Sequence, residues 1–238
     1  DGLPSTPMRW DNGFYDAGNG LIIFRGEEPW YHIDLYAEAF FKAVRELGIE
    51  QTVAIEGYNG PCPPDQGRRI GCIYSKAEMK QELEKYGLQF SSYGSRGRQG
   101  PTIGMALVTI AHYTHPDLEM FRLGAMAPMY PFTTTDNQQV VINRDHRSFY
   151  EIVRRLKAMF DLDLDLSELQ ALGETESVQM QRTLEEVSDA NAQAKVFIDR
   201  VRADYTFIPF QEHVDLAPGL DQALDDILRN MTDSPDAK

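Results

Sequence analysis

The chain contains 238 residues, of which 42% are hydrophobic and 25% are charged, the proportions of an ordinary globular domain. Its formal net charge is −14, and residues 161–238 carry 18 acidic against 6 basic side chains, so this part of the chain would repel nucleic acid. No apolar run approaches the ~18 residues that cross a bilayer, and we expect neither a nucleic-acid nor a membrane partner.

The chain has two cysteines, Cys62 and Cys72. Two thiols cannot form a metal cage alone and need not pair, so we expect free thiols in a reducing cytoplasm. His112 and His115 lie three residues apart, but no acidic or cysteine partner is spaced to complete a metal set. The sequence also lacks a Walker loop and a dinucleotide fingerprint. It therefore predicts a cytoplasmic protein without a metal or a cofactor.

The N-terminal part begins with residues 1–20, rich in Gly, Pro, Asp and Asn, which are expected to form an irregular arm. The apolar run Leu21–Phe24 is typical of a strand that is buried on both faces. From Ile33 the apolar residues recur at helical spacing up to Leu47, and Gly48 is expected to end that helix as a C′ glycine.

A second strand is predicted over Thr52–Ile55, followed by the loop Glu56–Gly60. Two strands joined by one helix form a parallel βαβ unit with a right-handed crossover, and such sheets bind ligands beyond the carboxyl ends of their strands. The loop Glu56–Gly60 is therefore the first place where we expect a binding site.

The middle of the chain predicts a short edge strand over Ile70–Tyr74. Ser75 is a candidate N-cap, with Glu78 completing a capping box, for a helix that ends at Gly87. Ser91–Gly100 contains two arginines and is expected to form a basic loop.

Pro101–Thr102 opens the next predicted helix, whose apolar character is typical of a helix packed against a sheet. Phe121–Ala127 predicts a third strand, which ends at Pro128–Pro131. Asn143 is expected to cap a further helix. The core face of that helix is predicted to carry Phe149, Ile152, Val153, Leu156 and Phe160.

Residues 174–205 carry a repeat of 3.5 residues. Its seam steps by four and three residues through Met180, Leu184, Val187, Asn191, Ala194, Ile198, Val201 and Tyr205. The repeat predicts one long helix that pairs with a second helix, within the chain or across a subunit interface; an ordinary amphipathic helix lying on the domain is the alternative. Asp165–Leu172 is the nearest candidate partner in sequence. A polar residue in such a seam weakens packing, so Asn191→Leu is predicted to raise stability.

Together the elements predict an α/β fold of three layers, with a mainly parallel sheet flanked by helices and a C-terminal helical elaboration. Residues 1–160 would form the α/β core and residues 161–205 a helical arm. Residues 206–232, with a last helix over Pro218–Asn230, would pack on the core.

Two features lie where α/β sheets bind ligands. The first is Glu56–Gly60. The second is Gly100–Gly104, a glycine-containing turn before a helix N-terminus, whose free N–H groups favour anions; a turn that merely begins the helix is the alternative. The candidate binding pocket consists of Glu56, Tyr58, Asn59, Gly100, Thr102, Gly104 and Tyr130.

With these pieces in order, the chain resembles the family of the second proteasome assembly chaperone, from about Leu21 to Asn230. The specific parts of the resemblance are Leu21–Phe24 followed by Gly26-Glu27-Glu28-Pro29, the helix Tyr36–Gly48, the turn Gly100-Pro101-Thr102 and the strand end Ala127-Pro128-Met129-Tyr130. The resemblance implies a fold akin to the purine nucleoside phosphorylases, a helical elaboration near the C-terminus and a tendency to form homo-oligomers.

Two hypotheses on function follow. The first is a non-enzymatic, assembly-chaperone-like module that binds a client protein, which the sequence does not identify, and acts as a homo-oligomer, with a trimer as the expected size. The second is a small-molecule enzyme of the nucleoside-processing or ATP-dependent carboxylate-amine ligase type. It would use Glu56, Asn59 and Gly100–Gly104, and it rests on fold analogy.

Overall fold

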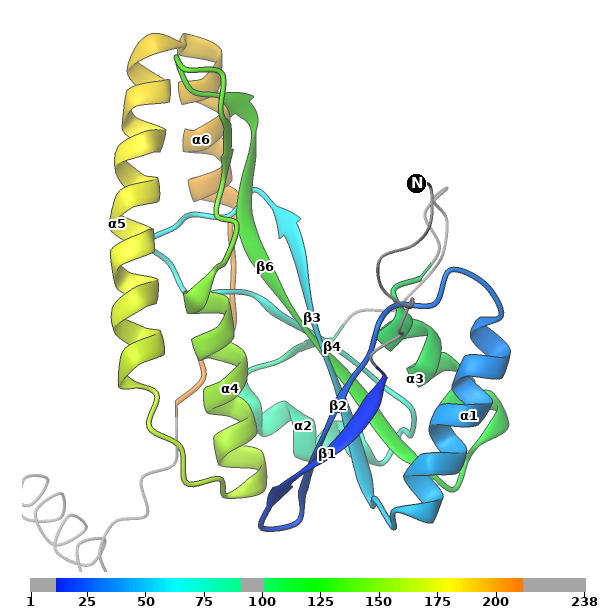
Figure 1. Cartoon of the computed structure of the whole chain (residues 1–238). Helices are drawn as coiled ribbons and strands as arrows, with labels where there is room; N and C mark the ends of the chain where they lie inside the picture. Colours follow the sequence, from blue (N-terminus) through cyan, green and yellow to red (C-terminus); the bar gives the residue numbers. More distant parts are fainter. Residues whose placement is uncertain (1–11, 91–100, 212–238) are drawn as a thin grey trace, which may run out of the picture.

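The computed structural model describes residues 12–90 and 101–211 (Figure 1). The strands are β1 Gly13–Gly18, β2 Leu21–Arg25, β3 Gln51–Gly60, β4 Ile70–Tyr74, β5 Gln89–Phe90, β6 Glu119–Thr133 and β7 Gln139–Val141. The helices are α1 Ile33–Glu46, α2 Met79–Leu83, the 3₁₀ turn η1 Glu84–Tyr86, α3 Ile103–Thr114, α4 His146–Phe160, α5 Ser167–Ala190 and α6 Ala192–Asp204. Within the described ranges, no helix is both long and apolar enough to cross a membrane.

The central sheet has the strand order β3–β6–β4–β5. β3 runs parallel to β6 and β4 parallel to β5, whereas β4 runs antiparallel to β6. β7 pairs antiparallel with the far end of β6. The predicted α/β class is confirmed, and the sheet is mixed. The predicted edge strand Ile70–Tyr74 is an internal strand instead, because β5 pairs with its outer side.

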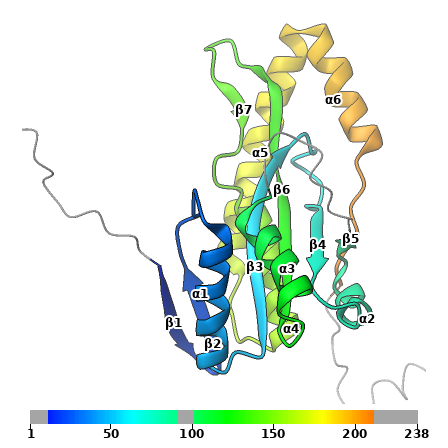
Figure 2. The same cartoon turned by 90° about the vertical axis from the view of Figure 1, so that its right-hand side faces the viewer.

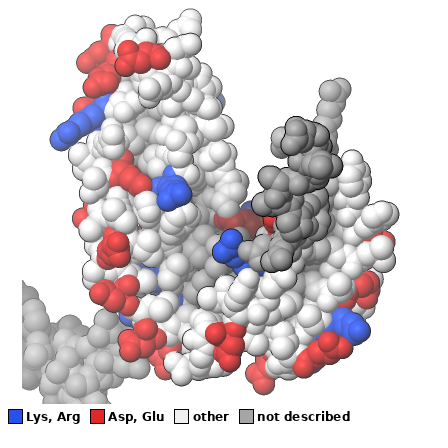
Figure 3. Space-filling view, in the orientation of Figure 1, with Lys and Arg blue, Asp and Glu red and all other residues white. Residues whose placement is uncertain are grey.

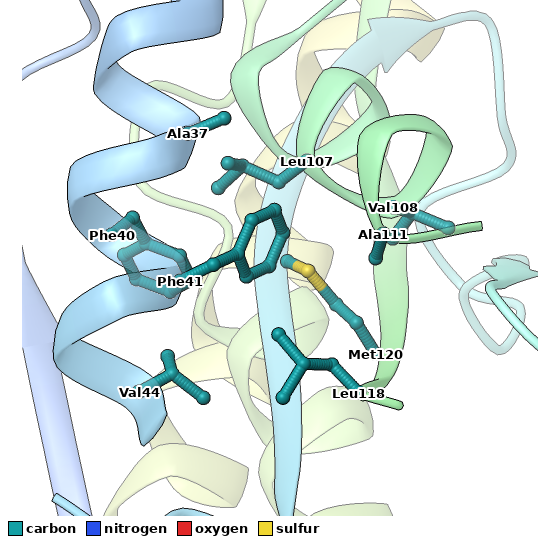
Figure 4. Packing of buried hydrophobic residues seen from close by; sticks show 9 residues of the cluster. All are labelled: Ala37, Phe40, Phe41, Val44, Leu107, Val108, Ala111, Leu118 and Met120. Carbon is teal, nitrogen blue, oxygen red and sulfur yellow. The ribbon is translucent and has the colours of Figure 1, made fainter. Parts of the chain in front are cut away.

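Helices cover both faces of the sheet, with α1 and α3 on one side and α4 on the other (Figure 1). Met120 of β6 enters the core under α1 and α3, whereas its neighbour Phe121 enters the core under α4, because successive side chains of a strand point to opposite faces. The first core is shown in Figure 4 and consists of Ala37, Phe40, Phe41, Val44, Leu107, Val108, Ala111, Leu118 and Met120.

α5 and α6 form a helical hairpin beside the far end of β6 and β7 (Figure 2). The residues that it buries with these strands are Tyr130, Val140, Met180, Leu184, Val187, Ala194 and Ile198. Five of the eight seam positions are therefore buried, Val201 and Tyr205 are partly buried and Asn191 is exposed, and the prediction of one long helix is wrong. The chain turns at Asn191, which has an extended backbone (φ −141°, ψ 107°), and each half of the repeat packs beside the other half rather than against Asp165–Leu172.

Asn191 is the N-cap of α6. Its side-chain oxygen accepts hydrogen bonds from the backbone N–H groups of Gln193 (2.9 Å) and Ala194 (3.2 Å). Asparagine is among the residues that satisfy helix N-termini best. The prediction that Asn191→Leu raises stability is therefore withdrawn, because that substitution would remove both hydrogen bonds.

The N-terminal segment also differs from its prediction. Gly13–Gly18 is a strand rather than part of an irregular arm, and it pairs antiparallel with β2. β2 is not a neighbour of β3 in either described sheet, so the expected parallel βαβ pairing is absent from the described residues. Phe14 and Phe24 pack on Phe40 of α1. The ring centroid of Phe40 lies 5.7 Å from that of Phe14 and 5.1 Å from that of Phe24. The hairpin therefore turns its apolar face to the helix, and Ile23 on its other face is 52% exposed.

Two predicted helix caps are wrong. α4 begins after Asp145, not after Asn143. The Ser75 hydroxyl accepts a hydrogen bond from the backbone N–H of Met120 at 2.9 Å and so links β4 to β6 instead of capping a helix. The Ser75 error arises because its hydroxyl is used by a backbone group 45 residues away, which the local sequence does not reveal.

The buried face of α4 is only partly the predicted one. Ile152 is buried, but Phe149 is 46% exposed and Phe160 37% exposed. Glu151 and Arg155 are buried in their place, joined by an ion pair between Oε2 and Nη1 of 2.6 Å.

The predicted helix ends at Gly48 and Gly87 are confirmed, since both residues have a positive φ, of 66° and 60°. The predicted loop 91–100, with Gly100, and the predicted helix over 218–230 lie outside the described residues. The division of the chain at residues 160 and 205 stays a prediction.

Candidate functional site

Glu56 lies in the second half of β3, where the sequence predicted a loop. Its Oε2 accepts hydrogen bonds from the hydroxyl of Thr102 and from Nε of Arg122, both at 2.6 Å. Its Oε1 accepts a hydrogen bond from the backbone N–H of Gly104 at 2.7 Å. One carboxylate thus ties together β3, β6 and the start of α3, and its hydrogen bonds leave it poorly placed to act as a free catalytic base.

The N-terminus of α3 is the predicted anion site. Its first free N–H group, of Ile103, donates to Oε1 of Glu28 at 3.1 Å, and the next, of Gly104, donates to Glu56. Carboxylates at this position satisfy orphan N–H groups and complement the helix dipole. The chain therefore supplies its own anions to this helix.

Gly104 allows α3 to approach the sheet this closely. A Cβ at this position would lie 2.6 Å from Oε1 of Glu56 and 2.9 Å from Cβ of Ala54. Such distances are shorter than side chains tolerate. The glycine of the predicted turn is thus required by a close approach rather than by a ligand.

Arg122 lies flat across Gly124 on the same face of the sheet. A Cβ on Gly124 would lie 2.0 Å from Nη1 of Arg122, so only glycine leaves room for the guanidinium. The Arg122 Cζ atom is 5.8 Å from the centroid of the Tyr58 ring. Burial raises the pKa of the Tyr58 hydroxyl, and the positive charges of Arg69 and Arg122 oppose that rise.

The other predicted site residues lie apart from this cluster. Asn59 is exposed, and the alternation along β3 places it on the face opposite to Glu56 and Tyr58. Tyr130 is fully buried beside the helical hairpin, where its hydroxyl donates to the carbonyl oxygen of Cys62 at 2.9 Å. The structure thus brings together Glu56, Tyr58, Thr102 and Gly104, but separates these four residues from Asn59 and Tyr130.

Sequence reasoning missed Glu28 and Arg122. Arg122 stands within the apolar run Phe121–Ala127, and a charged residue inside a buried strand requires a partner, so the signal was present in the sequence. Glu28 gives no such signal. Its contact with α3 spans 75 residues and depends on how the segment before α1 is placed.

His112 and His115, the pair considered as metal ligands from the sequence, both make contacts within the structure. Nδ1 of His112 lies 2.7 Å from the carbonyl oxygen of Ser75, and Nδ1 of His115 lies 2.9 Å from Nη2 of Arg45. Across residues 12–90 and 101–211, no three His, Cys, Asp or Glu side chains are grouped as metal ligands.

Hollows of the described surface lie elsewhere. One runs along the outer side of α1, from Glu38 to Glu46, and another lies between α5 and α6, next to Leu184 and Ile198. Both are open to solvent, and neither contains a residue of the candidate pocket.

The fold and the site define an α/β protein with a mixed sheet, a helical hairpin and a polar cluster that is used mainly to join its elements. No protein-family model and no curated protein matches the chain. Solved structures do match it. A PAC2 family protein from Streptomyces avermitilis has a TM-score of 0.57 and 19% identity, over 74% of this chain and 69% of that protein.

Two further solved structures are proteasome-assembly chaperone homologues. The one from Mycobacterium tuberculosis has a TM-score of 0.54 and 14% identity, over 68% of this chain and 61% of that protein. The other, PbaA from Pyrococcus furiosus, has a TM-score of 0.53 and 19% identity, over 83% of this chain and 75% of that protein. The resemblance inferred from the sequence is thus confirmed at the level of the fold: the chain has the α/β fold of PAC2-type proteins.

Proposed function

We propose that this chain is a non-enzymatic, assembly-chaperone-like module that binds a client protein and acts as a homo-oligomer, with a trimer as the expected size. Its fold is shared with proteasome-assembly chaperone homologues of bacteria and archaea. The hydrogen bonds of Glu56 to Thr102, Gly104 and Arg122 favour this role over the enzyme hypothesis, because they use the carboxylate that a reaction would need.

The observation that carries the proposal is an exposed apolar surface before and within the first turn of α1, which we call the Trp30 patch. It consists of Trp30, Tyr31 and Leu35, whose exposed fractions are 84%, 77% and 63%. Large aromatic side chains are enriched at protein interfaces and are rarely left this exposed together.

The charge of the surface indicates the kind of partner. Asp34 lies between Tyr31 and Leu35 of the Trp30 patch, and Glu38 follows Leu35 along α1. Figure 3 shows further acidic side chains along the α5 side of the molecule and its lower rim. A partner with an apolar contact region bordered by basic residues would complement this surface.

The test combines light scattering with capture from an extract of the native source. The proposal expects particles larger than the 27.0 kDa of one chain at micromolar concentration, and a captured protein that is lost when Trp30 and Tyr31 are both changed to Ala. Tyr113→Ala is the matched control. Tyr113 is 77% exposed, like Tyr31, but it lies in the last turn of α3 and outside the Trp30 patch. Particles of single-chain size together with equal capture by all variants would refute the proposal.

A thermal-shift screen with nucleosides, nucleotides and phosphate separates the two hypotheses on function. The chaperone-like role expects no ligand-dependent rise in the unfolding temperature from nucleosides or nucleotides. A reproducible rise that Glu56→Gln abolishes would favour the enzyme instead.

A further inference from the structure

The outer side of α1 carries a continuous row of exposed side chains, which we call the α1 stripe. Its members recur every three or four residues and so lie on one side of the helix, opposite the buried Ala37, Phe40 and Val44. The α1 stripe consists of Leu35, Glu38, Ala39, Lys42 and Glu46. The hollow on this side of the molecule is lined by its last four members together with Arg45. The outer side of α1 is thus open to solvent along the helix.

Large apolar side chains lie at both ends of the α1 stripe. At the N-terminal end, Trp30 and Tyr31 of the Trp30 patch are 84% and 77% exposed. At the C-terminal end, Leu47 is 47% exposed. The 14 residues of α1 span about 21 Å, so these two ends cannot cover each other within one chain. They meet when two α1 helices lie side by side in opposite directions.

The charges along α1 change sign from its first half to its second. Asp34 and Glu38 are acidic, whereas Lys42 and Arg45 are basic. The side chains of Glu38 and Lys42 are 63% and 75% exposed, so both are accessible to a neighbouring molecule. Turning a second copy by 180° places the acidic half of each helix against the basic half of the other. The sequence of α1 is therefore complementary to itself in the antiparallel direction.

The charges of the second half are only partly used within the chain. Arg45 forms an ion pair with Asp117, with 2.8 Å between Nε and Oδ2. Lys42 lies 3.7 Å from Oε1 of Glu46, and an exposed pair of this kind contributes little to stability. Lys42 is therefore the cation of α1 that is best placed to bind a second molecule.

One register satisfies the apolar ends and the charges together. Placing Trp30 of one copy opposite Leu47 of the other puts Glu38 opposite Ala39 of the other copy. Lys42 then lies three residues along from Ala39, less than one helical turn, which is within reach of the Glu38 carboxylate. The small side chain of Ala39 at the centre allows the two helices to approach closely.

The overall charge of the chain favours this face for self-association over the rest of the surface. Residues 161–238 carry 18 acidic and 6 basic side chains, so two copies repel each other there. Figure 3 shows acidic and basic side chains beside each other at the right-hand edge, where Figure 1 places α1. Four aromatic rings, two from each copy, would bury about 150–250 Å² each. Together they supply roughly half of the ~1,200–2,000 Å² that a specific interface buries.

From this pattern we propose that α1 forms a contact between two copies of the chain, antiparallel across a twofold axis. Trp30 of each copy packs on Leu47 of the other, and Glu38 pairs with Lys42. The inference rests on the homo-oligomer of the proposed function and names a surface for it. A twofold contact gives a dimer by itself, and six chains where a trimer forms through another surface. It covers the Trp30 patch, so a client that binds there has to displace the second copy.

The test measures the particle mass of the full chain by light scattering over a range of concentrations. We expect an even number of chains that halves on dilution. Lys42→Glu and Glu38→Lys each bring like charges together across the contact, and each should weaken the pairing about tenfold. An equimolar mixture of the two variants should restore pairing, because every new side chain then faces the opposite charge on the other copy.

Leu47→Gln tests the apolar end without changing the Trp30 patch and should weaken the pairing about fivefold. The matched control is Lys80→Glu on α2. Lys80 is 52% exposed and pairs with Glu84 four residues on, as Lys42 pairs with Glu46. Its replacement should leave the particle mass unchanged. Unfolding temperatures confirm that all variants are folded.

The possible failures separate this contact from the proposed function. A trimer whose mass Lys42→Glu and Leu47→Gln leave unchanged would overturn the α1 contact and leave the proposed function standing. Single chains at every concentration would overturn the contact and the homo-oligomer, whereas capture that depends on Trp30 would still support client binding. A mixture of the charge variants that fails to restore pairing would overturn the antiparallel arrangement.

Discussion

Two buried arginine–carboxylate pairs in this molecule are built differently. Arg68 donates Nε and Nη2 to the two carboxylate oxygens of Asp145, at 2.7 and 3.1 Å, and its Nη1 lies 3.1 Å from the carbonyl oxygen of Gln66. Arg122 gives only Nε to Glu56. The first pair is closed, with every guanidinium donor used, and the second is open. The closed pair uses its whole guanidinium within the fold, whereas the open pair uses one guanidinium nitrogen in its hydrogen bond to the carboxylate.

The largest effect is expected from breaking the closed pair with Asp145→Ala. Arg68 is 1% exposed and would be left as an uncompensated buried charge. We expect a loss of ~3–5 kcal/mol in the free energy of unfolding. Urea denaturation measures it. Asp136→Ala, at an exposed turn position, is the control and should change little; a loss below ~1 kcal/mol for Asp145→Ala would contradict the buried pair.

A smaller loss is expected when the open pair is changed by Glu56→Gln. The amide can still accept from Gly104, but it can no longer accept through both oxygens from Thr102, Gly104 and Arg122. The expected loss is ~1.5–3 kcal/mol, the usual effect of hydrogen bonds to a charged group. Denaturation under the same conditions as for Asp145→Ala ranks the two pairs, and the reverse order would refute the distinction between them.

Asn191 is a polar residue that, unlike the two buried ion pairs, lies at the surface, so its replacement is expected to cost less stability. Asn191→Leu removes the cap of α6, but water can reach the exposed N–H group of Gln193. The expected loss is ~0.5–2 kcal/mol. Asn191→Asp keeps the capping oxygen and should retain most of the stability. If Asn191→Leu stabilises the protein, the turn between α5 and α6 is not held by this cap.

The smallest expected effects concern the two thiols, whose reactivity depends on how deeply the surroundings of the two ion pairs are buried. Cys62 lies near Arg68 and Asp145, and Cys72 lies near Arg122. Burial raises the pKa of each thiol from about 9 to about 12. We expect very slow reaction with Ellman's reagent at pH 8 in the folded protein, and rapid reaction after unfolding.

The same pKa shifts predict how stability depends on pH. Above about pH 9 the thiols ionise in the unfolded chain but stay protonated in the folded chain, so the unfolded state binds fewer protons. The free energy of unfolding should therefore fall as the pH rises from about 9 to about 12. Cys62→Ser and Cys72→Ser should each reduce this slope, and an unchanged slope in both would show that other groups cause it.

The candidate site was predictable to the extent that strand ends and helix starts can be located in a sequence. Glu56 and Thr102 were found in this way, and the structure places them 2.6 Å apart. The sequence predicts a loop over Glu56–Gly60, and side chains of a loop can point in any direction. Asn59 was therefore expected in the same pocket as Glu56. Within β3 the alternation of side chains turns Asn59 to the other face.

The sequence by itself determined the features that depend on neighbours along the chain. Gly48 and Gly87 end helices because glycine adopts a positive φ at little cost. The apolar seam residues from Met180 to Ile198 are buried because their spacing keeps them on one side of each helix. Only the tertiary structure decided what depends on partners distant in sequence. Glu28 and Glu56 reach α3 across 75 and 48 residues, and β2 pairs with β1 rather than β3. Several side chains of the sequence could act as the acceptor or donor in each of these contacts. Local patterns do not indicate which of them lies within hydrogen-bonding distance after folding.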